Sequence, residues 1–189
     1  MDRLPYQVTA AAERYEWIGR LPVAVLLENI RSVYNVGAFF RTADAARVEK
    51  LYLCGITAHP PHRGIRKTAL GAEDAVPWER CSDPAETIAG LRERGYQIAA
   101  IETSLHSVDL FDWIPVFPVC VVFGNEVEGI QPASAARSDV HVRLPMLGVK
   151  HSLNVATAGG IVIYELLRKY RFQYPWPSPE GATFPLNSR

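Results

Sequence analysis

The chain has 189 residues, of which 48% are hydrophobic, and it carries 20 basic and 20 acidic residues. This length and hydrophobic content suit one domain with a sizeable core, and the net charge of zero excludes a globally basic nucleic-acid binder. The cysteines lack metal-ligand spacing, the charged N-terminus lacks an apolar signal core, and no apolar run approaches the ~20 residues that span a bilayer, so we expect a cytoplasmic protein with no metal site and no membrane segment.

Strand-like and helix-like patterns alternate along the chain. Apolar, β-rich runs predict strands at Val23–Ile30, Lys50–Ile56, Tyr96–Glu102, Val116–Gly124 and Asp139–Met146. Helices are predicted at Asn35–Arg47, Asp83–Arg94, Glu128–Ser138 and Ser152–Arg171, with an irregular basic segment at His59–Trp78. Because the strands are apolar throughout, we predict an α/β fold, a three-layer sandwich with a mainly parallel sheet covered on both faces.

Basic residues are concentrated near the N-terminal end of this pattern. From Asn29 to Lys67 there are seven Lys or Arg residues and two acidic residues, Asp44 and Glu49. Such an excess suits a face that contacts phosphates. A solvated surface explains the same residues, and both interpretations stay open.

The stretch YNVGAFFRTADA, residues 34–45, predicts a short helix with an arginine inside it. Asn35 is expected as its N-cap, and the apolar stripe is expected to face the sheet. The other side carries small residues, with Gly37 and Arg41 on its flank, so we expect something to pack there, most simply a partner subunit. A structural ion pair of Arg41 with Asp44 or Glu49 is the alternative.

Two further Gly- and Asn-rich turns follow strands, where open α/β sheets bind ligands. In FGNEVEGI, residues 123–130, Asn125 and Glu126 either carry acid–base chemistry or brace a tight turn. In HSLNVATAGG, residues 151–160, Ser152 is expected as the N-cap of the last helix, and the glycine pair implies close approach by a backbone or a ligand. The dinucleotide G-x-G-x-x-G fingerprint and the P-loop are both absent.

Together the three segments resemble the SpoU/TrmH-type branch of the SPOUT RNA methyltransferases. ENIRSVYNVGAFFRTADA is similar to the first motif of that family, VVFGNEVEGI to the second and LPMLGVKHSLNVATAGGIVIYEL to the third, in the same order and spacing. Two positions depart from the family pattern: Ser32-Val33 stands where Asp-Pro is frequent, and Ala156 where a second serine is common. The resemblance implies one catalytic domain at 21–172, between an N-terminal extension at 1–20 and a Pro-rich tail at 173–189.

The resemblance also implies a deep C-terminal trefoil knot and a homodimer whose active site lies at the subunit interface. S-adenosylmethionine would bind in the knot, largely through main-chain groups. Its contacts, carried over by motif position, would be Thr103, Gly124, Leu144, Met146 and Leu153. Because main-chain groups would hold the cofactor, no cofactor-binding motif of side chains is expected in the sequence.

The implied reaction is methyl transfer to a ribose 2′-hydroxyl of RNA, and the implied catalytic residues are Asn35, Arg41, Glu126, Ser152 and Asn154. Arg41 is the candidate to activate the hydroxyl. Because arginine stays protonated, stabilisation of the developing alkoxide and of a phosphate is favoured, with literal proton abstraction left open. The two asparagines would position Arg41 and the ribose, Glu126 would orient Arg41 or the turn, and Ser152 would serve the site entrance.

About twenty residues precede the first strand, so target selection is expected to come from the catalytic domain, its basic segment and the tails. Minimal members of the family often act on transfer RNA, so the resemblance favours transfer RNA over ribosomal RNA as the substrate. Two alternatives remain: a non-catalytic RNA-binding or assembly protein that kept the knotted fold, and a hydrolase that uses Ser152 with His151, although the G-x-S-x-G elbow is absent.

Overall fold

The computed structural model describes residues 19–175, so the predicted N-terminal extension and Pro-rich tail lie almost wholly outside the described residues. The strands within this part are β1 (Leu21–Glu28), β2 (Val48–Cys54), β3 (Trp78–Cys81), β4 (Gln97–Ile101), β5 (Val108–Asp109), β6 (Val119–Phe123) and β7 (Val140–Arg143). The helices are α1 (Val33–Ala45), α2 (Arg63–Ala69), α3 (Ala72–Ala75), α4 (Pro84–Glu93), α5 (Pro132–Ala135) and α6 (Val155–Gln173). All five predicted strands and all four predicted helices exist.

The strands form one sheet in the order β3-β2-β1-β6-β4-β7-β5, and every neighbouring pair is parallel. The two central strands are the most apolar: all five residues of β6 are buried, and so are all but one of β1. Strands that are buried on both faces read as continuous apolar runs. The prediction of a mainly parallel sheet is confirmed.

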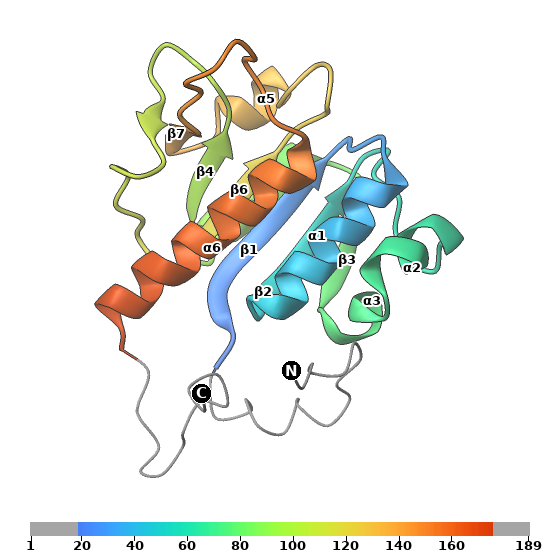
Figure 1. Cartoon of the computed structure of the whole chain (residues 1–189). Helices are drawn as coiled ribbons and strands as arrows, with labels where there is room; N and C mark the ends of the chain where they lie inside the picture. Colours follow the sequence, from blue (N-terminus) through green and yellow to red (C-terminus); the bar gives the residue numbers. More distant parts are fainter. Residues whose placement is uncertain (1–18, 176–189) are drawn as a thin grey trace, which may run out of the picture.

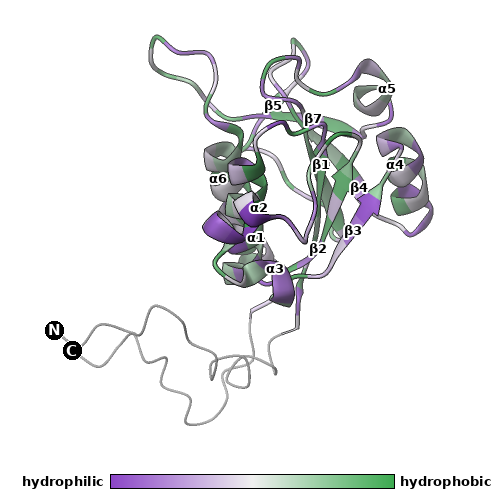
Figure 2. Cartoon of the chain, turned by 90° about the vertical axis from the view of Figure 1, so that its right-hand side faces the viewer, coloured by the Kyte–Doolittle hydropathy of each residue, from purple (hydrophilic) through white to green (hydrophobic). Residues whose placement is uncertain are grey.

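Helices cover both faces of the sheet, which gives three layers. Figure 1 shows α1 and α6 side by side in front of the sheet, and Figure 2 shows α4 and α5 on the opposite face. Alternate residues of β1 enter two separate cores: Val23, Val25 and Leu27 pack beneath α1 and α6, whereas Ala24 and Leu26 pack beneath α4. The predicted three-layer α/β fold is therefore confirmed, and the trefoil knot stays a prediction.

Two glycines let helices on the front face approach closely. A Cβ atom on Gly37 would lie 2.0 Å from the Thr68 hydroxyl of α2, and one on Gly159 would lie 2.2 Å from the Phe39 ring of α1. The small flank of α1 at Gly37 therefore meets α2 of the same chain, not the expected partner subunit. The neighbour of Gly159 is a side chain rather than the expected backbone or ligand, and Gly160 faces open space.

Two predictions of local structure are wrong. The segment at 59–78 is not irregular, because it contains α2 and α3, separated by left-handed backbone at Leu70 and Gly71, and it leads into the edge strand β3. Helix α5 covers only Pro132–Ala135, since residues 125–129 form a tight turn. Among the described helices, none is long and apolar enough to cross a membrane.

Candidate active site

A cavity of about 640 Å³ opens at the carboxyl edge of the sheet, where β4, β6 and β7 end. Its wall comes from the segments that follow these strands and from the start of α6, which meet at the top of Figure 1. Every residue predicted to contact a cofactor lies in this wall: Thr103, Gly124, Leu144, Met146 and Leu153. Three of the predicted catalytic residues, Glu126, Ser152 and Asn154, line it as well.

Glu126 ties the β6 loop to the start of α1. Its Oε2 accepts a hydrogen bond from the Arg31 amide at 2.9 Å, and its Oε1 accepts one from the Ser32 amide at 3.1 Å. Oε1 also accepts a bond from the Asn35 side chain, 2.9 Å from Nδ2. One carboxylate thus holds three donors that lie more than 90 residues away in the sequence.

These hydrogen bonds set the charge state of Glu126. Partial burial alone would raise the pKa of its carboxyl group. The bonds that it accepts, led by the one from the Arg31 amide and followed by that from the Asn35 side chain, outweigh burial, so its pKa is lowered. Glu126 is therefore a carboxylate at neutral pH and an acceptor only.

Asn35 and Asn154 extend this network to the last helix. The Asn154 Nδ2 donates to the Asn35 Oδ1 at 3.1 Å, while its own Oδ1 caps α6 by accepting from the amides of Ala156 and Thr157. Residues of all three motifs, 126, 35 and 154, are therefore joined by direct side-chain hydrogen bonds.

Both helix caps differ from the prediction. Helix α1 begins two residues earlier than expected, at Val33, and its N-cap is Ser32, whose hydroxyl accepts from the Asn35 amide at 3.3 Å. Helix α6 begins after Asn154 rather than at Ser152. Serine and asparagine are both good N-caps, so residue type alone did not decide between neighbouring candidates. The early start of α1 leaves the Asn35 side chain available to Glu126.

The turn after β6 is closed by its own hydrogen bonds. The amide and carbonyl groups of Asn125 and Gly129 bond each other at 3.0 and 2.9 Å, and the Asn125 Oδ1 accepts from the amides of Val127 and Glu128. The Asn125 Nδ2 donates to the Asn29 carbonyl at 2.9 Å, which fixes the turn to the end of β1. The bracing interpretation is therefore confirmed for Asn125.

Gly129 has φ +73°, and a Cβ there would lie 2.5 Å from a carboxylate oxygen of Glu102. The turn thus needs glycine for both its backbone conformation and its close neighbour.

Two further carboxylates, not among the predicted site residues, hold the segment that follows β6. Glu102 accepts from the amides of Thr103 and Ile130 and lies in the cavity wall. Glu28 is fully buried, and its two oxygens accept from the Ser134 hydroxyl at 2.7 Å and from the Gln131 amide at 3.1 Å. Burial raises the pKa of Glu28 despite these bonds. An acidic residue at the end of an apolar strand is the sequence signal that marks both.

Arg41 lies apart from the cavity of its own chain. It is exposed on α1, six residues after Asn35, which is about 9 Å along the helix axis. The wall of the cavity does not include it. His151 and Ser152 are both exposed in that wall, and within residues 19–175 no hydrogen bond joins the two side chains, so nothing supports the hydrolase alternative.

The chain is similar to known proteins along most of its length. Residues 22–164 match the model of the SpoU rRNA Methylase family. The chain belongs to this family. The resemblance of the three motifs is thereby confirmed.

Two of the relatives of this chain act on different kinds of RNA. The 23S rRNA (guanosine-2′-O-)-methyltransferase RlmB of Pseudomonas aeruginosa is 30% identical over 153 residues, which cover 79% of this chain and 60% of that protein. The tRNA (guanosine(18)-2′-O)-methyltransferase of Aquifex aeolicus is 32% identical over 146 residues, covering 77% of this chain and 68% of that protein.

A solved structure, the AdoMet-bound rRNA methyltransferase from Sinorhizobium meliloti, has a TM-score of 0.73 at 31% identity and covers 77% of this chain and 56% of that chain. The chain spans 59% to 61% of the length of several curated relatives that it matches. The similarity thus covers the part of those proteins that corresponds to the fold described above.

Proposed function

We propose that this protein transfers a methyl group from S-adenosylmethionine to a ribose 2′-hydroxyl of RNA. The observation that carries the proposal is the joined network of Glu126, Asn35 and Asn154, which brings all three family motifs to the edge of one cavity. We further propose that residues 21–172 form the catalytic domain, that the protein is cytoplasmic, and that transfer RNA is its substrate, as for the relative from Aquifex aeolicus.

The cavity fits the cofactor in size and chemistry. Its volume of about 640 Å³ lies within the range of roughly 300–1,000 Å³ that is usual for such ligands. Leu144, Met146 and Leu153 supply apolar walls, and the strand ends at Thr103 and Gly124 supply backbone groups. S-adenosylmethionine supplies an electrophilic methyl group when bound, so the protein has only to hold the ribose and to help its hydroxyl lose a proton.

The network residues would position the ribose and the residues around it. Glu126 holds the loop before α1 and the Asn35 side chain, and Asn154 holds Asn35 from the other side. Arg41 would stabilise the alkoxide that develops at O2′ and a neighbouring phosphate, because a guanidinium donates to both and does not itself accept a proton. Ser152 would contact the RNA at the entrance.

A homodimer would complete the site. What supports this is the position of Arg41, exposed and outside the cavity of its own chain, together with exposed apolar side chains on α6, at Ile161, Tyr164 and Phe172. In such a dimer Arg41 of one subunit would serve the cavity of the other.

The test uses methyl-labelled S-adenosylmethionine and an unmodified transfer RNA transcript. Transfer to O2′ makes the adjacent phosphodiester bond resistant to alkali, so the label must appear in alkali-resistant dinucleotides. Arg41→Ala is expected to abolish transfer while cofactor binding, measured by calorimetry, is unchanged. A fully active Arg41→Ala variant would remove Arg41 from the mechanism, and RNA binding without any methyl transfer would favour the non-catalytic alternative.

Mixing two inactive variants tests the shared site. An equimolar mixture of Arg41→Ala and Glu126→Gln, allowed to exchange subunits, contains heterodimers with one intact site if Arg41 acts on the partner's cavity. We expect recovery of about a quarter of the wild-type activity in a twofold dimer. No recovery, although native mass spectrometry shows heterodimers, would place Arg41 in the cavity of its own chain.

A further inference from the structure

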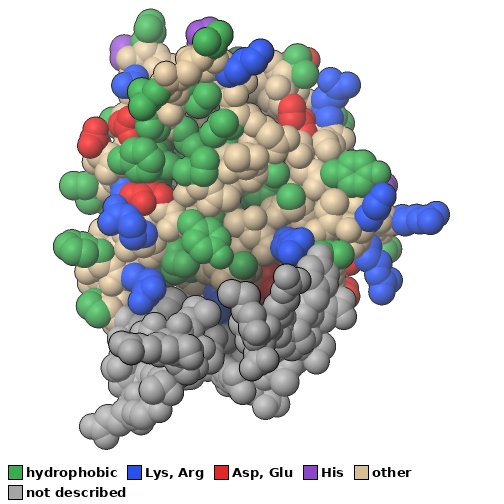
Figure 3. Space-filling model, in the orientation of Figure 1, with side chains coloured by type: hydrophobic (Ala, Val, Ile, Leu, Met, Phe, Trp, Pro, Cys, Tyr) green, Lys and Arg blue, Asp and Glu red, His purple; other side chains and the backbone are tan. Residues whose placement is uncertain are grey.

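Helix α2 carries a basic surface beside the candidate active site. Its buried side, Ile65 and Ala69, packs toward α1, and its exposed side carries Arg63, Arg66 and Lys67. Positions separated by three and four residues share one face of a helix, so the three cations point the same way. Figure 3 shows Lys and Arg side chains gathered at the right-hand edge of the molecule, where Figure 1 places α2.

The structure separates this face from the other basic residues of the same sequence region. Lys50 lies on β2 and pairs with Glu79 at 2.6 Å, and Arg47, directly before the same strand, is half-buried. The segments around the site, residues 29–43 and 55–72, contain five Lys or Arg residues and no Asp or Glu. Of the acids that follow on α3, Glu73 is buried and bonded to the Gly71 amide, which leaves Asp74 exposed there. The positive charge of α2 is therefore not balanced by acids within these segments.

The basic face is fixed to the active-site network. The Thr68 hydroxyl of α2 donates to the Tyr34 carbonyl at 3.2 Å, and the close contact at Gly37 holds α1 against α2. Tyr34 directly precedes Asn35, whose side chain bonds Glu126. Helix α2 is thus attached to the turn of α1 that carries Asn35, at the edge of the cavity.

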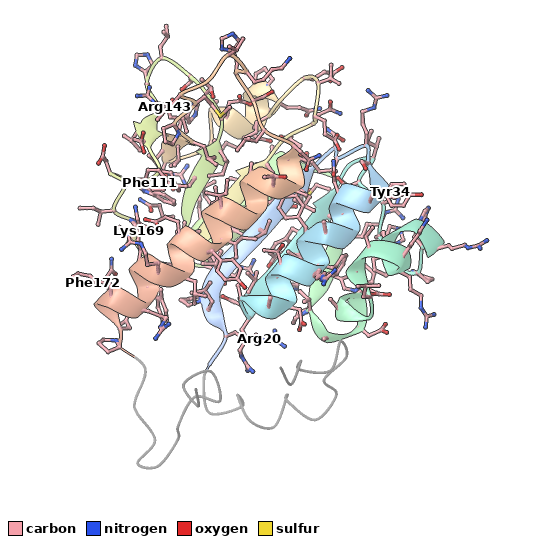
Figure 4. The ribbon with its side chains drawn as sticks, viewed as in Figure 1. Arg20, Tyr34, Phe111, Arg143, Lys169 and Phe172 are labelled. Atoms are coloured by element: carbon pink, nitrogen blue, oxygen red, sulfur yellow. The ribbon has the colours of Figure 1, made fainter. Side chains whose placement is uncertain are left out.

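An exposed aromatic ring lies beside the basic face, on the residue that precedes Asn35. The Tyr34 side chain is 53% exposed, and the Lys67 ammonium lies 5.9 Å from its ring centroid. Figure 4 shows Tyr34 at the end of α1 that is closest to α2. A positive groove with an aromatic platform is the combination that binds single-stranded nucleic acid, because cations take phosphates and the ring stacks on a base.

We propose that α2 binds the phosphate backbone of the substrate RNA next to the nucleotide in the cavity, through Arg63, Arg66 and Lys67, and that Tyr34 stacks on a neighbouring base. The positive charge of α2 favours RNA as its ligand, because a phosphate backbone is complementary to three unbalanced cations and an apolar protein surface is not. The proposal rests on the proposed function and names the surface by which the RNA would reach the site.

The experiment measures RNA binding as a function of salt. The α2 variant is Arg63→Gln/Arg66→Gln/Lys67→Gln. The matched control, Lys50→Gln/Arg92→Gln/Arg137→Gln, also removes three positive charges but lies on the opposite face of the sheet. The probe is an unmodified transfer RNA transcript. Each lost phosphate contact lowers the slope of log Kd against log salt concentration by about 1. The slope should therefore fall by about 3 in the α2 variant and stay close to the wild-type value in the control.

Tyr34 is tested in the same assay. Tyr34→Leu should weaken RNA binding roughly tenfold, whereas Tyr34→Phe, which keeps the ring, should bind as the wild type does. Cofactor binding by calorimetry and thermal unfolding should be unchanged in all variants, which separates a lost RNA contact from a damaged fold. In steady-state assays the α2 variant should raise KM for the RNA far more than it lowers kcat.

The outcomes distinguish this inference from the proposed function. If the wild type methylates RNA and the α2 variant keeps the wild-type salt slope, the α2 surface is wrong and the function stands. If the wild type binds RNA without methylating it, the function is wrong, and the salt slopes still test the surface. An α2 variant that changes oligomeric state in sedimentation would assign this face to a protein interface and overturn the inference.

Discussion

Two single charges, Glu126 and Lys169, organise opposite ends of the molecule in different ways. Glu126 accepts from the backbone amides of Arg31 and Ser32 and from a side chain, and it stays exposed at a cavity. Lys169 of α6 is buried. Its ammonium group donates to the carbonyls of three residues of one loop: Leu110, Phe111 and Trp113. Figure 4 shows Lys169 pointing from α6 toward Phe111.

The pKa values separate the two roles. The hydrogen bonds of Glu126 outweigh partial burial and lower its pKa, which favours the charged form. Burial lowers the pKa of Lys169, which disfavours the charged form, even though Glu165 lies 3.6 Å away. The charge of Glu126 is thus stabilised by its hydrogen bonds and is accessible to solvent. Lys169 is buried instead, and its hydrogen bonds hold a loop to α6.

Lys169→Met should give the largest effect, and it should be an effect on stability. The change leaves the loop carbonyls without their donor, and we expect a loss of about 2–4 kcal/mol in the free energy of unfolding, measured by urea denaturation. Methyl transfer per folded molecule should be unchanged. The control is Arg168→Gln, which removes the exposed neighbour that also pairs with Glu165 and should leave the unfolding midpoint where it is. Equal midpoints for Lys169→Met and the wild type would show that the loop does not depend on this lysine.

Glu126→Gln should give the reverse pattern. An amide offers one acceptor oxygen in place of two and brings donors toward the amides of Arg31 and Ser32. The loop before α1 should shift, and misplacement by about 1 Å costs on the order of a hundredfold in rate, measured as kcat for methyl transfer. The midpoint of unfolding should move less than in Lys169→Met. The matched control is Glu93→Gln, an exposed carboxylate of α4 on the other face of the sheet, and equal activities of the two variants would contradict a role for Glu126.

The same contrast explains what the sequence could and could not predict about the fold. The central strands were predictable because strands that are buried on both faces have continuous apolar sequences. The edge strand β3 was not, since its sequence WERC carries two charges and its pairing with β2 is decided by distant residues. Helix α2 was missed because seven residues, three of them basic, are too few to show a helical period.

For the site, residue types were predictable and their partners were not. The motifs marked Glu126, Asn35 and Asn154, and the structure joins them directly. The amides of Arg31 and Ser32 had no sequence signal, because every residue but proline carries such a donor. For Arg41 the sequence predicts a role in the reaction, yet one chain alone leaves Arg41 outside the cavity wall.

The smallest expected effect is a difference in how stability depends on pH. The folded-state pKa of Glu126 lies below the ordinary value of 4.5 for a glutamate, so its contribution to stability is fully present above pH 4.5 and is lost as the pH falls through the folded-state value. For Lys169, whose pKa is lowered from 10.5, the folded state sheds its proton before the unfolded state does. Its contribution therefore grows as the pH rises toward 10.5.

Urea unfolding of the wild type, Glu126→Gln and Lys169→Met across the pH range tests both signs. The gap between the wild type and Glu126→Gln should stay constant at neutral pH and narrow below pH 4.5, because only the wild type then has to protonate a hydrogen-bonded carboxylate. The difference in the free energy of unfolding between the wild type and Lys169→Met should be constant at acidic pH and increase at alkaline pH. A Glu126→Gln gap that widens in acid would mean that the amides of Arg31 and Ser32 do not stabilise the charged carboxylate, and the network at the cavity would lose its electrostatic basis.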